Sequence, residues 1–248
     1  MENDVMEMSN YTATTWTSAQ SVNGIEDQES YTALHYDFHQ PLHHHEELAN
    51  AVTHGAAAIA MLIGTIALCS SMAGKTWITI AFCVLFSLSC CAVFTASALS
   101  HCLLSDQRLL KKLRSWDQGL IYVMIAGTYT PLVWTYAESH ARIPLLIGMW
   151  IAAIGGFLSK VVVKHRVNSM GLTTYLILGW APAFWLFMQV PKGLLFWMLA
   201  GCVCYIVGVL FLMNDRRKKY FHVMWHLCVI AGATMHYMGV YNFVALVQ

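Results

Sequence analysis

The 248-residue chain is 58% hydrophobic and only 11% charged, and its net charge is +1. A soluble domain of this size needs many more charged side chains to cover its surface, so the composition places the chain among membrane proteins. Because the sequence has no basic patch large enough to follow a phosphate backbone, we expect no nucleic-acid partner.

The first 45 residues differ from the rest of the chain. They are rich in acidic, Ser, Thr, Asn and Gln residues, contain no Lys or Arg, and end in His43, His44 and His45. This composition is typical of a disordered tail, and the lack of an apolar stretch argues against a signal peptide. The histidines could bind a metal weakly or simply be solvated. We therefore divide the chain into an acidic, His-rich tail at 1–45 and a membrane domain at 46–248.

Seven apolar runs are long enough to form membrane-spanning helices, which need about 20 residues each. They are Leu48–Met72, Trp77–Leu103, Gln118–Tyr136, Leu145–Val163, Leu172–Gln189, Leu194–Met213 and His222–Val247. The connections between them are too short to hold a second folded domain. The sequence therefore predicts an all-α membrane protein, a bundle of seven transmembrane helices.

The distribution of positive charge predicts the orientation of this bundle. With seven spans, all Lys and Arg residues except Lys75, Arg142 and Lys192 fall on the side of the N-terminus. Positively charged loops stay in the cytoplasm, so we expect a cytoplasmic N-terminus and a C-terminus on the opposite side. Six or eight spans would remove this asymmetry.

Three of the predicted spans contain pairs of residues that weaken a helix. The pairs are Gly127 with Pro131, Gly155 with Gly156, and Gly179 with Pro182. Such residues can kink a helix and widen a cavity, or they can allow neighbouring helices to pack closely.

Polar residues occur at four predicted helix ends, all on the cytoplasmic side. They are His101 at the end of the second span, Asp117 at the start of the third, His222 and His226 at the start of the seventh, and Glu46, Glu47, Asn50 and His54 at the start of the first. Histidine and charged side chains are expensive within membrane spans and usually functional. Their common depth predicts a polar site near the cytoplasmic face.

Two pairs of these polar residues are spaced by one helical turn. Ser97 and His101 are four residues apart, and so are His222 and His226. Two histidines one turn apart can present nitrogens to one Zn²⁺ ion, and His101 is the natural third ligand. Three histidine ligands leave the fourth tetrahedral position for water, as in catalytic zinc sites. The sequence thus predicts Zn²⁺ bound by His101, His222 and His226.

Asp117 and Ser97 supply the remaining chemistry of the predicted site. Zn²⁺ makes its bound water acidic enough to attack an amide or ester carbonyl, and Asp117 is the candidate general base or the group that orients a ligand. Ser97 could hydrogen-bond the oxyanion, the bound water or Asp117. Because the site lies within reach of the bilayer, we expect a lipid substrate.

The same histidines also have a simpler interpretation, which is that they form hydrogen bonds between helices. His236 lies about 15 Å beyond His226 along the helix, too far to share its ion, and is interpreted as a buried, hydrogen-bonded histidine. His54 could contact a substrate or pack with Asn50.

Four motifs resemble the superfamily of progestin and adipoQ receptors and haemolysin III proteins. They are EELANAVTHG at 46–55, SALSH at 97–101, RSWDQGLIYVMIAGTYTP at 114–131, and HVMWHL at 222–227, followed by Gly232 and His236. The resemblance covers about residues 45–248, and the wording of the third motif is closer to the haemolysin III branch than to the adiponectin receptors.

The resemblance implies a seven-helix bundle with a cytoplasmic N-terminus and a zinc ion near the cytoplasmic face. Carried over to this sequence, the ligands are His101, His222 and His226, with Asp117 and Ser97 beside them. A distant similarity to alkaline ceramidases implies a zinc-dependent hydrolase of ceramide-like or other lipid amides.

Two alternatives to the hydrolase follow from other members of the superfamily. One is a receptor or regulator of membrane homeostasis in which zinc is structural, and the other is a pore-forming, haemolysin-like cytolysin. A pore needs a polar stripe through several spans, and the outer halves of these spans are almost wholly apolar. The fold alone does not decide between these functions, and the sequence names no protein partner.

Overall fold

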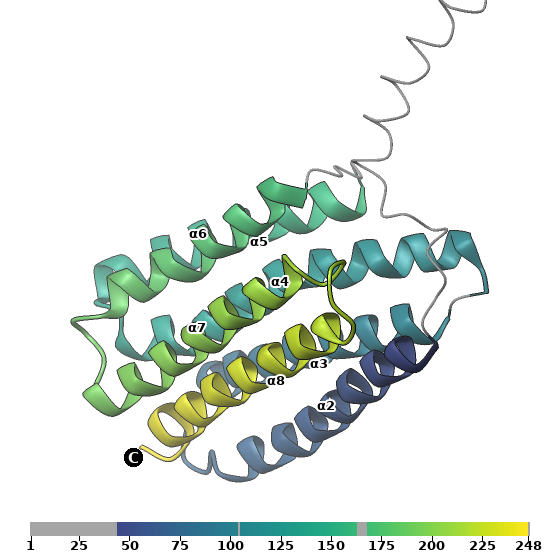
Figure 1. The fold of residues 1–248 in the computed structure, drawn as a ribbon. Helices are drawn as coiled ribbons and strands as arrows, with labels where there is room; N and C mark the ends of the chain where they lie inside the picture. Colours follow the sequence, from purple (N-terminus) through teal and green to yellow (C-terminus); the bar gives the residue numbers. More distant parts are fainter. Residues whose placement is uncertain (1–43, 104, 163–167, 248) are drawn as a thin grey trace, which may run out of the picture. The chain divides into compact units, whose positions relative to one another are not determined.

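The computed structural model describes residues 44–103, 105–162 and 168–247. Within these ranges the chain forms seven α-helices and one π-helix and no strand, as expected for the all-α class (Figure 1). In chain order they are α2 (His44–Ser70), α3 (Trp77–Cys102), α4 (Gln107–Tyr136), α5 (Ser139–Val161), α6 (Asn168–Leu186), α7 (Lys192–Leu212), α8 (Phe221–Val240) and the π-helix η1 (Tyr241–Ala245). The predicted tail lies outside the described residues except for His44 and His45, which begin α2.

Most helices that follow one another in the chain pack side by side, because the connections between them are short. α2 packs on α3, α3 on α4, α4 on α5, and α7 on α8. α8 also lies against α2, so the last α-helix closes on the first described one (Figure 1). α4 additionally contacts α6 and α8, which makes it the central helix of the bundle. This arrangement brings the end of α3 and the start of α8 together.

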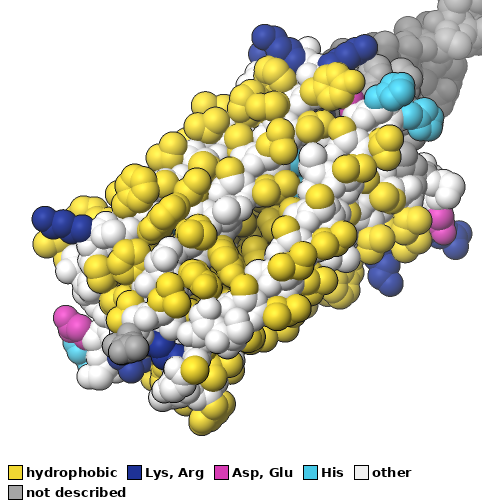
Figure 2. All heavy atoms as spheres, turned by 90° about the horizontal axis from the view of Figure 1, so that it is seen from below, with side chains coloured by type: hydrophobic (Ala, Val, Ile, Leu, Met, Phe, Trp, Pro, Cys, Tyr) yellow, Lys and Arg dark blue, Asp and Glu magenta, His cyan; other side chains and the backbone are white. Residues whose placement is uncertain are grey.

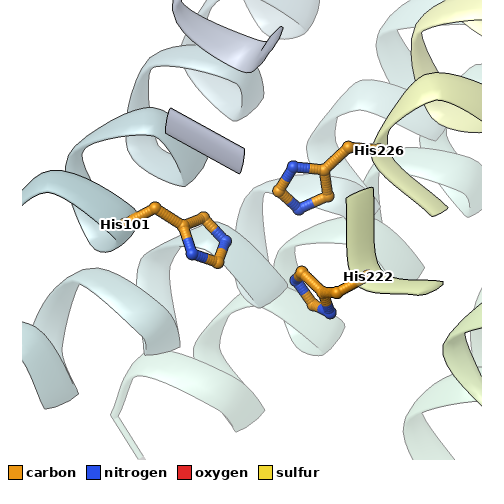
Figure 3. Close-up of side chains that lie close together, drawn as sticks. All are labelled: His101, His222 and His226. Carbon is orange, nitrogen blue, oxygen red and sulfur yellow. The ribbon is translucent and has the colours of Figure 1, made fainter. Parts of the chain in front are cut away.

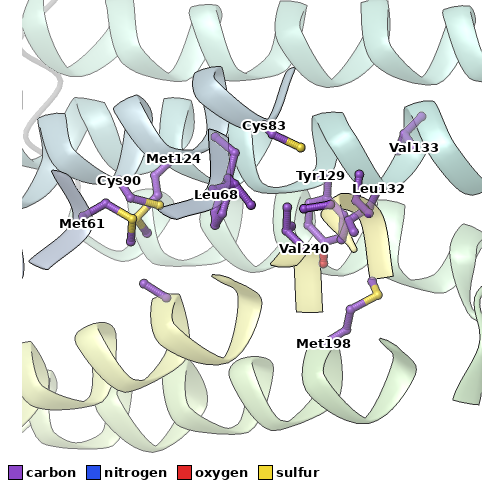
Figure 4. Packing of buried hydrophobic residues seen from close by; sticks show 14 of the residues in the cluster. Met61, Leu68, Cys83, Cys90, Met124, Tyr129, Leu132, Val133, Met198 and Val240 are labelled. Atoms are coloured by element: carbon purple, nitrogen blue, oxygen red, sulfur yellow. The ribbon is translucent and has the colours of Figure 1, made fainter. Parts of the chain in front are cut away.

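The helices are held together by one large cluster of buried apolar side chains with members from α2 to η1 (Figure 4). Leu68, Phe86 and Leu194 are completely buried in it. The small side chains of Cys83 and Cys90 fill the space between larger ones in the same cluster. Because lipid is as apolar as this core, close van der Waals packing rather than hydrophobic exclusion stabilises the bundle.

The outer surface of the bundle is also apolar. Ile66, Phe184 and Met188 are 72%, 85% and 87% exposed. On the face shown in Figure 2, hydrophobic side chains cover the middle, and Lys, Arg, Asp and Glu lie toward the two ends. Five helices are long and apolar enough to cross a bilayer, namely α2, α3, α5, α7 and α8 together with η1. The protein is therefore an integral, multi-pass membrane protein.

The third helix is longer than the predicted span Gln118–Tyr136, because α4 begins at Gln107. Its start is fixed by the side chain of Asp106, which accepts hydrogen bonds from the backbone N–H groups of Arg108 and Leu109 at 2.8 and 3.2 Å. With 30 residues, α4 is about 45 Å long, whereas the apolar core of a bilayer is about 30 Å thick. Asp117 consequently lies well inside the helix instead of at its start.

The last predicted span, His222–Val247, is not one uniform α-helix. After Val240 the backbone changes to the wider π-helix η1, in which the N–H group of Leu246 donates to the carbonyl of Tyr241 at 3.1 Å. The hydroxyl of Tyr136 donates to the backbone carbonyl of Phe243 at 2.5 Å. This side chain from α4 supplies a partner for a carbonyl at the end of the helix, which a bilayer could not supply.

Some of the helix-weakening residues allow close packing of helices, and others line a cavity. A Cβ atom added to Gly127 would lie 2.3 Å from the hydroxyl oxygen of Ser89, so this glycine allows α3 and α4 to pack closely. A Cβ atom added to Gly155 would meet nothing within 4 Å. Gly155 and Pro182 instead line an apolar cavity of about 990 Å³ between α5 and α6.

We expect the neighbouring glycines Gly155 and Gly156 to respond differently to the same substitution. A Cβ atom on Gly156 would lie 2.5 Å from the ring of Tyr122, whose hydroxyl is fixed by Thr174 at 2.6 Å. Gly156→Ala should therefore lower the free energy of unfolding by about 1–3 kcal/mol because of overpacking. Gly155→Ala, the matched control, should leave it unchanged or raise it slightly, since alanine favours the helix. Thermal unfolding in detergent measures both, and equal stability of the two variants would contradict this packing.

Candidate metal centre

Three histidines converge where the end of α3 meets the start of α8. His101 lies in the last turn of α3, and His222 and His226 lie on successive turns at the start of α8. Each offers one ring nitrogen, and these three atoms lie within 4.8 Å of one another. Figure 3 shows the rings turned toward a common point, with His101 coming from one helix and the other two from the second. A single metal ion can therefore be held by all three, which is the set of ligands predicted from the sequence.

Two carboxylates fix the orientation of two of these rings. The Nδ1–H group of His101 donates to the Oε2 atom of Glu47 at 2.5 Å, and that of His222 donates to the Oδ2 atom of Asp215 at 3.0 Å. A ring whose Nδ1 atom carries the proton has its lone pair on Nε2, which is then available to a metal. Carboxylate–histidine–metal arrangements of this kind are characteristic of metal centres, and imidazole nitrogens suit Zn²⁺ and similar ions.

The start of α8 is positioned by a second carboxylate on α2. Tyr220, which precedes the helix, has a φ of 63°, a left-handed conformation that is uncommon for a residue with a side chain. Its backbone N–H group donates to the Oε1 atom of Glu46 at 3.2 Å. Glu46 and Glu47 are neighbours in sequence, so adjacent residues of α2 hold the start of α8 and the end of α3.

His226 is the most deeply buried of the three candidate ligands, with 1% of its surface exposed. Its ring stacks on that of His54 from α2, with 3.7 Å between the ring centres and 11° between the planes. The Nδ1 atom of His226 has no hydrogen-bond partner among the described residues. His54 is thus a fourth histidine at the site, although it does not belong to the group of three that can share one ion.

Ser97 and Asp117 lie next to the triad but outside the group that can bind the ion. Ser97 is 1% exposed, and its hydroxyl faces the carboxyl group of Asp117 without a hydrogen bond of regular geometry. Asp117 also interacts electrostatically with His222 and Arg114. The structure therefore brings together all five residues that the sequence singled out.

Sequence reasoning missed the functions of Glu47 and Asp215. Glu47 had been placed at the correct helix end, but nothing in its spacing indicates that it contacts His101 from another helix. Asp215 stands directly before the basic run Arg216–Lys219, and no motif distinguishes it in the sequence. An acidic residue shortly before a helix that begins with histidine was the available signal, because a turn can fold it back on that helix.

Two other histidines lie elsewhere. His236 is buried further along α8 against Tyr205, with 5.7 Å between the ring centres, and its Nδ1 atom has no partner among the described residues. The hydrogen bond expected for it is therefore not found at that nitrogen. His140 pairs with Glu138 at 3.4 Å at the start of α5, where both side chains are exposed.

The match to a known family extends over the whole described site. Residues 42–237 match the family described as haemolysin-III related, and this range includes every residue of the metal centre. The chain belongs to the haemolysin-III related family. The resemblance inferred from the four motifs is thereby confirmed.

Several known proteins are similar to this chain over most of their length. Hemolysin-3 of Bacillus cereus is 30% identical over 204 residues, which cover 80% of this chain and 92% of the relative. The Hemolysin-3 homolog of Bacillus subtilis strain 168 is 29% identical, over 76% of this chain and 89% of its own. The human Monocyte to macrophage differentiation factor is 24% identical, over 80% of this chain and 84% of its own.

In this haemolysin-III related protein, the two carboxylates that hold the histidine rings should be required for tight metal binding. Glu47→Ala and Asp215→Ala are each expected to weaken Zn²⁺ binding by about 10- to 100-fold, because the ring they release is free to rotate. Competition with a chromophoric chelator in detergent measures the affinity. Glu138→Ala is the matched control, since it removes a carboxylate that pairs with a histidine, His140, at an exposed position away from the site. Unchanged affinity in both site variants would show that the carboxylates do not orient ligands.

Proposed function

We propose that this protein is a zinc-dependent hydrolase of lipid amides with a ceramide-like substrate. The observation that supports the proposal most strongly is the convergence of His101, His222 and His226, three neutral nitrogen donors within 4.8 Å of one another. Such a set leaves one tetrahedral position open, which is a property of catalytic rather than structural zinc sites. When bound there, Zn²⁺ would supply an activated water and polarise a carbonyl.

Asp117 and Ser97 are the groups we assign to proton transfer and to oxyanion binding. The Asp117 carboxyl group lies beside the triad and interacts with His222, so it can accept a proton from a water held there. It can then deliver that proton to the leaving amine. The Ser97 hydroxyl is buried and faces the Asp117 carboxyl group, and once Asp117 has accepted a proton the hydroxyl can donate to the carbonyl oxygen of a substrate.

The apolar cavity between α5 and α6 supports a lipid as the substrate. Its volume of about 990 Å³ is large enough for an acyl chain, although none of the triad lines it. Its lining includes Tyr122, which lies little more than one helical turn beyond Asp117 on α4. A chain in this cavity could place its polar end toward Asp117.

We further propose that all seven helices span the membrane, with the N-terminus in the cytoplasm and the C-terminus opposite. Lys75, in the connection between α2 and α3, donates a hydrogen bond to the backbone carbonyl of Val247. The C-terminal end therefore lies beside a connection that contains a single basic residue. Arg114 lies 4.0 Å from Glu47 at the other end, close to the basic residues that begin α4. The two ends of the bundle therefore differ in positive charge as the orientation requires.

Labelling from one side of the membrane tests whether α4 spans it. Lys112→Cys near the start of α4 and Glu138→Cys just after its end are both exposed positions. In sealed vesicles of known orientation, a membrane-impermeant thiol reagent should label the first from the cytoplasmic side only and the second from the opposite side only. The unsubstituted protein gives the background from its native cysteines. Labelling of both positions from the same side would exclude this topology.

The catalytic proposal is tested by zinc content and ceramide hydrolysis measured on the same purified preparations. Wild type should contain about one Zn²⁺ per chain and release fatty acid, and His226→Ala should lose both properties. Asp117→Asn should keep the zinc while kcat falls by about 10²–10⁴-fold, because only the proton acceptor is removed.

Other outcomes of the same experiment favour the alternative functions. Zinc without turnover of any lipid amide would favour a receptor or a regulator of membrane homeostasis with structural zinc. Release of a trapped dye from vesicles, independent of zinc, would favour a pore of the kind that the name Hemolysin-3 suggests for the relatives. Absence of zinc from wild type would leave interhelical hydrogen bonding as the function of the histidines.

A further inference from the structure

We propose that Asn50 and His54 on α2 form a subsite that binds the amide and hydroxyl groups of the substrate beside the metal ligands. This inference rests on the proposed lipid amide hydrolase and names the residues that recognise the polar part of its substrate. The relevant feature is a set of buried polar atoms that have no partner within the described protein.

His54 is enclosed by the helices that carry the metal ligands. Its ring stacks on His226 of α8 at 3.7 Å and contacts Phe94 of α3 with 5.3 Å between ring centres. Only 3% of its surface is exposed. The side chain therefore lies where α2, α3 and α8 meet, directly next to a candidate ligand of the ion.

Both ring nitrogens of His54 lack a hydrogen bond of regular geometry among the described residues, and the nearest polar group is the backbone of His226. The Oδ1 atom of Asn50 also lacks a hydrogen-bond partner among the described residues. A single buried polar atom without a partner costs about 1–3 kcal/mol, and such atoms are rare in folded proteins. Their concentration at one place indicates that a polar molecule occupies it when the protein functions.

The spacing on α2 places Asn50 and His54 on one side of that helix. They are four residues apart, one turn of helix, and both are almost completely buried. The backbone of Asn50 also lies against the ring of His226. The ring of His54 thus lies against a candidate metal ligand, and the Asn50 side chain is buried one turn before it on the same side of α2.

The chemistry of these atoms defines the ligand. A neutral histidine has one N–H donor and one acceptor nitrogen, and the Oδ1 atom of Asn50 is an acceptor. The ligand must therefore offer N–H or O–H donors as well as a carbonyl or hydroxyl acceptor within a few ångströms. An amide with neighbouring hydroxyl groups has this combination, whereas an ester of the same length lacks the N–H donor. Packing on His226 does not itself require a histidine, since a phenylalanine could provide the same ring.

Binding of two matched lipids to zinc-loaded protein tests the subsite without relying on turnover. The probes are a fluorescent ceramide and a fluorescent diacylglycerol of the same chain lengths, titrated in detergent. Wild type should bind the ceramide at least tenfold more tightly, because diacylglycerol lacks the amide N–H donor and has one hydroxyl where ceramide has two. In His54→Phe and in Asn50→Leu this preference should fall to less than about threefold, while Zn²⁺ affinity and thermal stability stay at or above the wild-type values.

The control variant is His45→Phe, the same substitution at an exposed position of α2. It should keep the full preference for ceramide. Asn50→Leu leaves the stacked rings untouched, so it tests the subsite even where His54→Phe fails to fold.

The subsite is wrong if both variants bind ceramide like wild type, or if His54→Phe and Asn50→Leu lose zinc and thereby reveal a function in holding the metal ligands. In either case the proposed hydrolase stands, provided that wild type binds the ceramide. If wild type itself binds neither lipid, the proposed function and the subsite both fail.

Discussion

The whole candidate site depends on two adjacent carboxylates at the start of α2. Glu47 holds the ring of His101 at the end of α3, and Glu46 holds the backbone just before α8. Carboxylates are costly at the edge of a bilayer unless each finds a partner. The partners lie at the end of α3 and at the start of α8. The candidate metal ligands therefore reach their positions only when α2 is packed correctly against both helices.

Metal binding should in turn contribute to folding. The ligands come from helices far apart in sequence, so an ion that binds all three joins α3 to α8. The apolar core acts along the middle of these helices, whereas the histidines and carboxylates act at their ends. With an ion bound, the bundle would be stabilised both by its apolar core and by metal coordination, and a chelator would remove only the second contribution.

Much of this architecture follows from the sequence, since apolar length predicts the helices and four-residue spacing predicts which polar side chains share a face. Spacing connects His222 with His226, and the common depth predicted from the positive charges adds His101 to them. The early start of α4 could not be predicted in this way. The length of an apolar run indicates the membrane-spanning part of a helix, whereas α4 begins at a polar cap, Asp106. Nor could the π-helix after Val240 be predicted.

Contacts between helices were the other limit of the sequence. Spacing along one helix contains no information about which residue of another helix faces it. For this reason the pairing of Glu47 with His101 and the stacking of His54 on His226 appear only in the folded bundle. The contact between Asp215 and His222 is likewise visible only in the folded protein, because a turn and not a helix brings the two residues together.

The turn between α7 and α8 also fixes the rotational setting of the last helix. Tyr220 adopts its left-handed conformation directly before α8, and its amide is tied to Glu46. Each residue of an α-helix turns by about 100° and advances by about 1.5 Å. The addition or loss of one residue in this turn would therefore swing His222 and His226 away from His101 while leaving the apolar character of α8 intact. The length of this turn is thus under a stricter constraint than its composition, and natural variation in it should consist of substitutions rather than insertions.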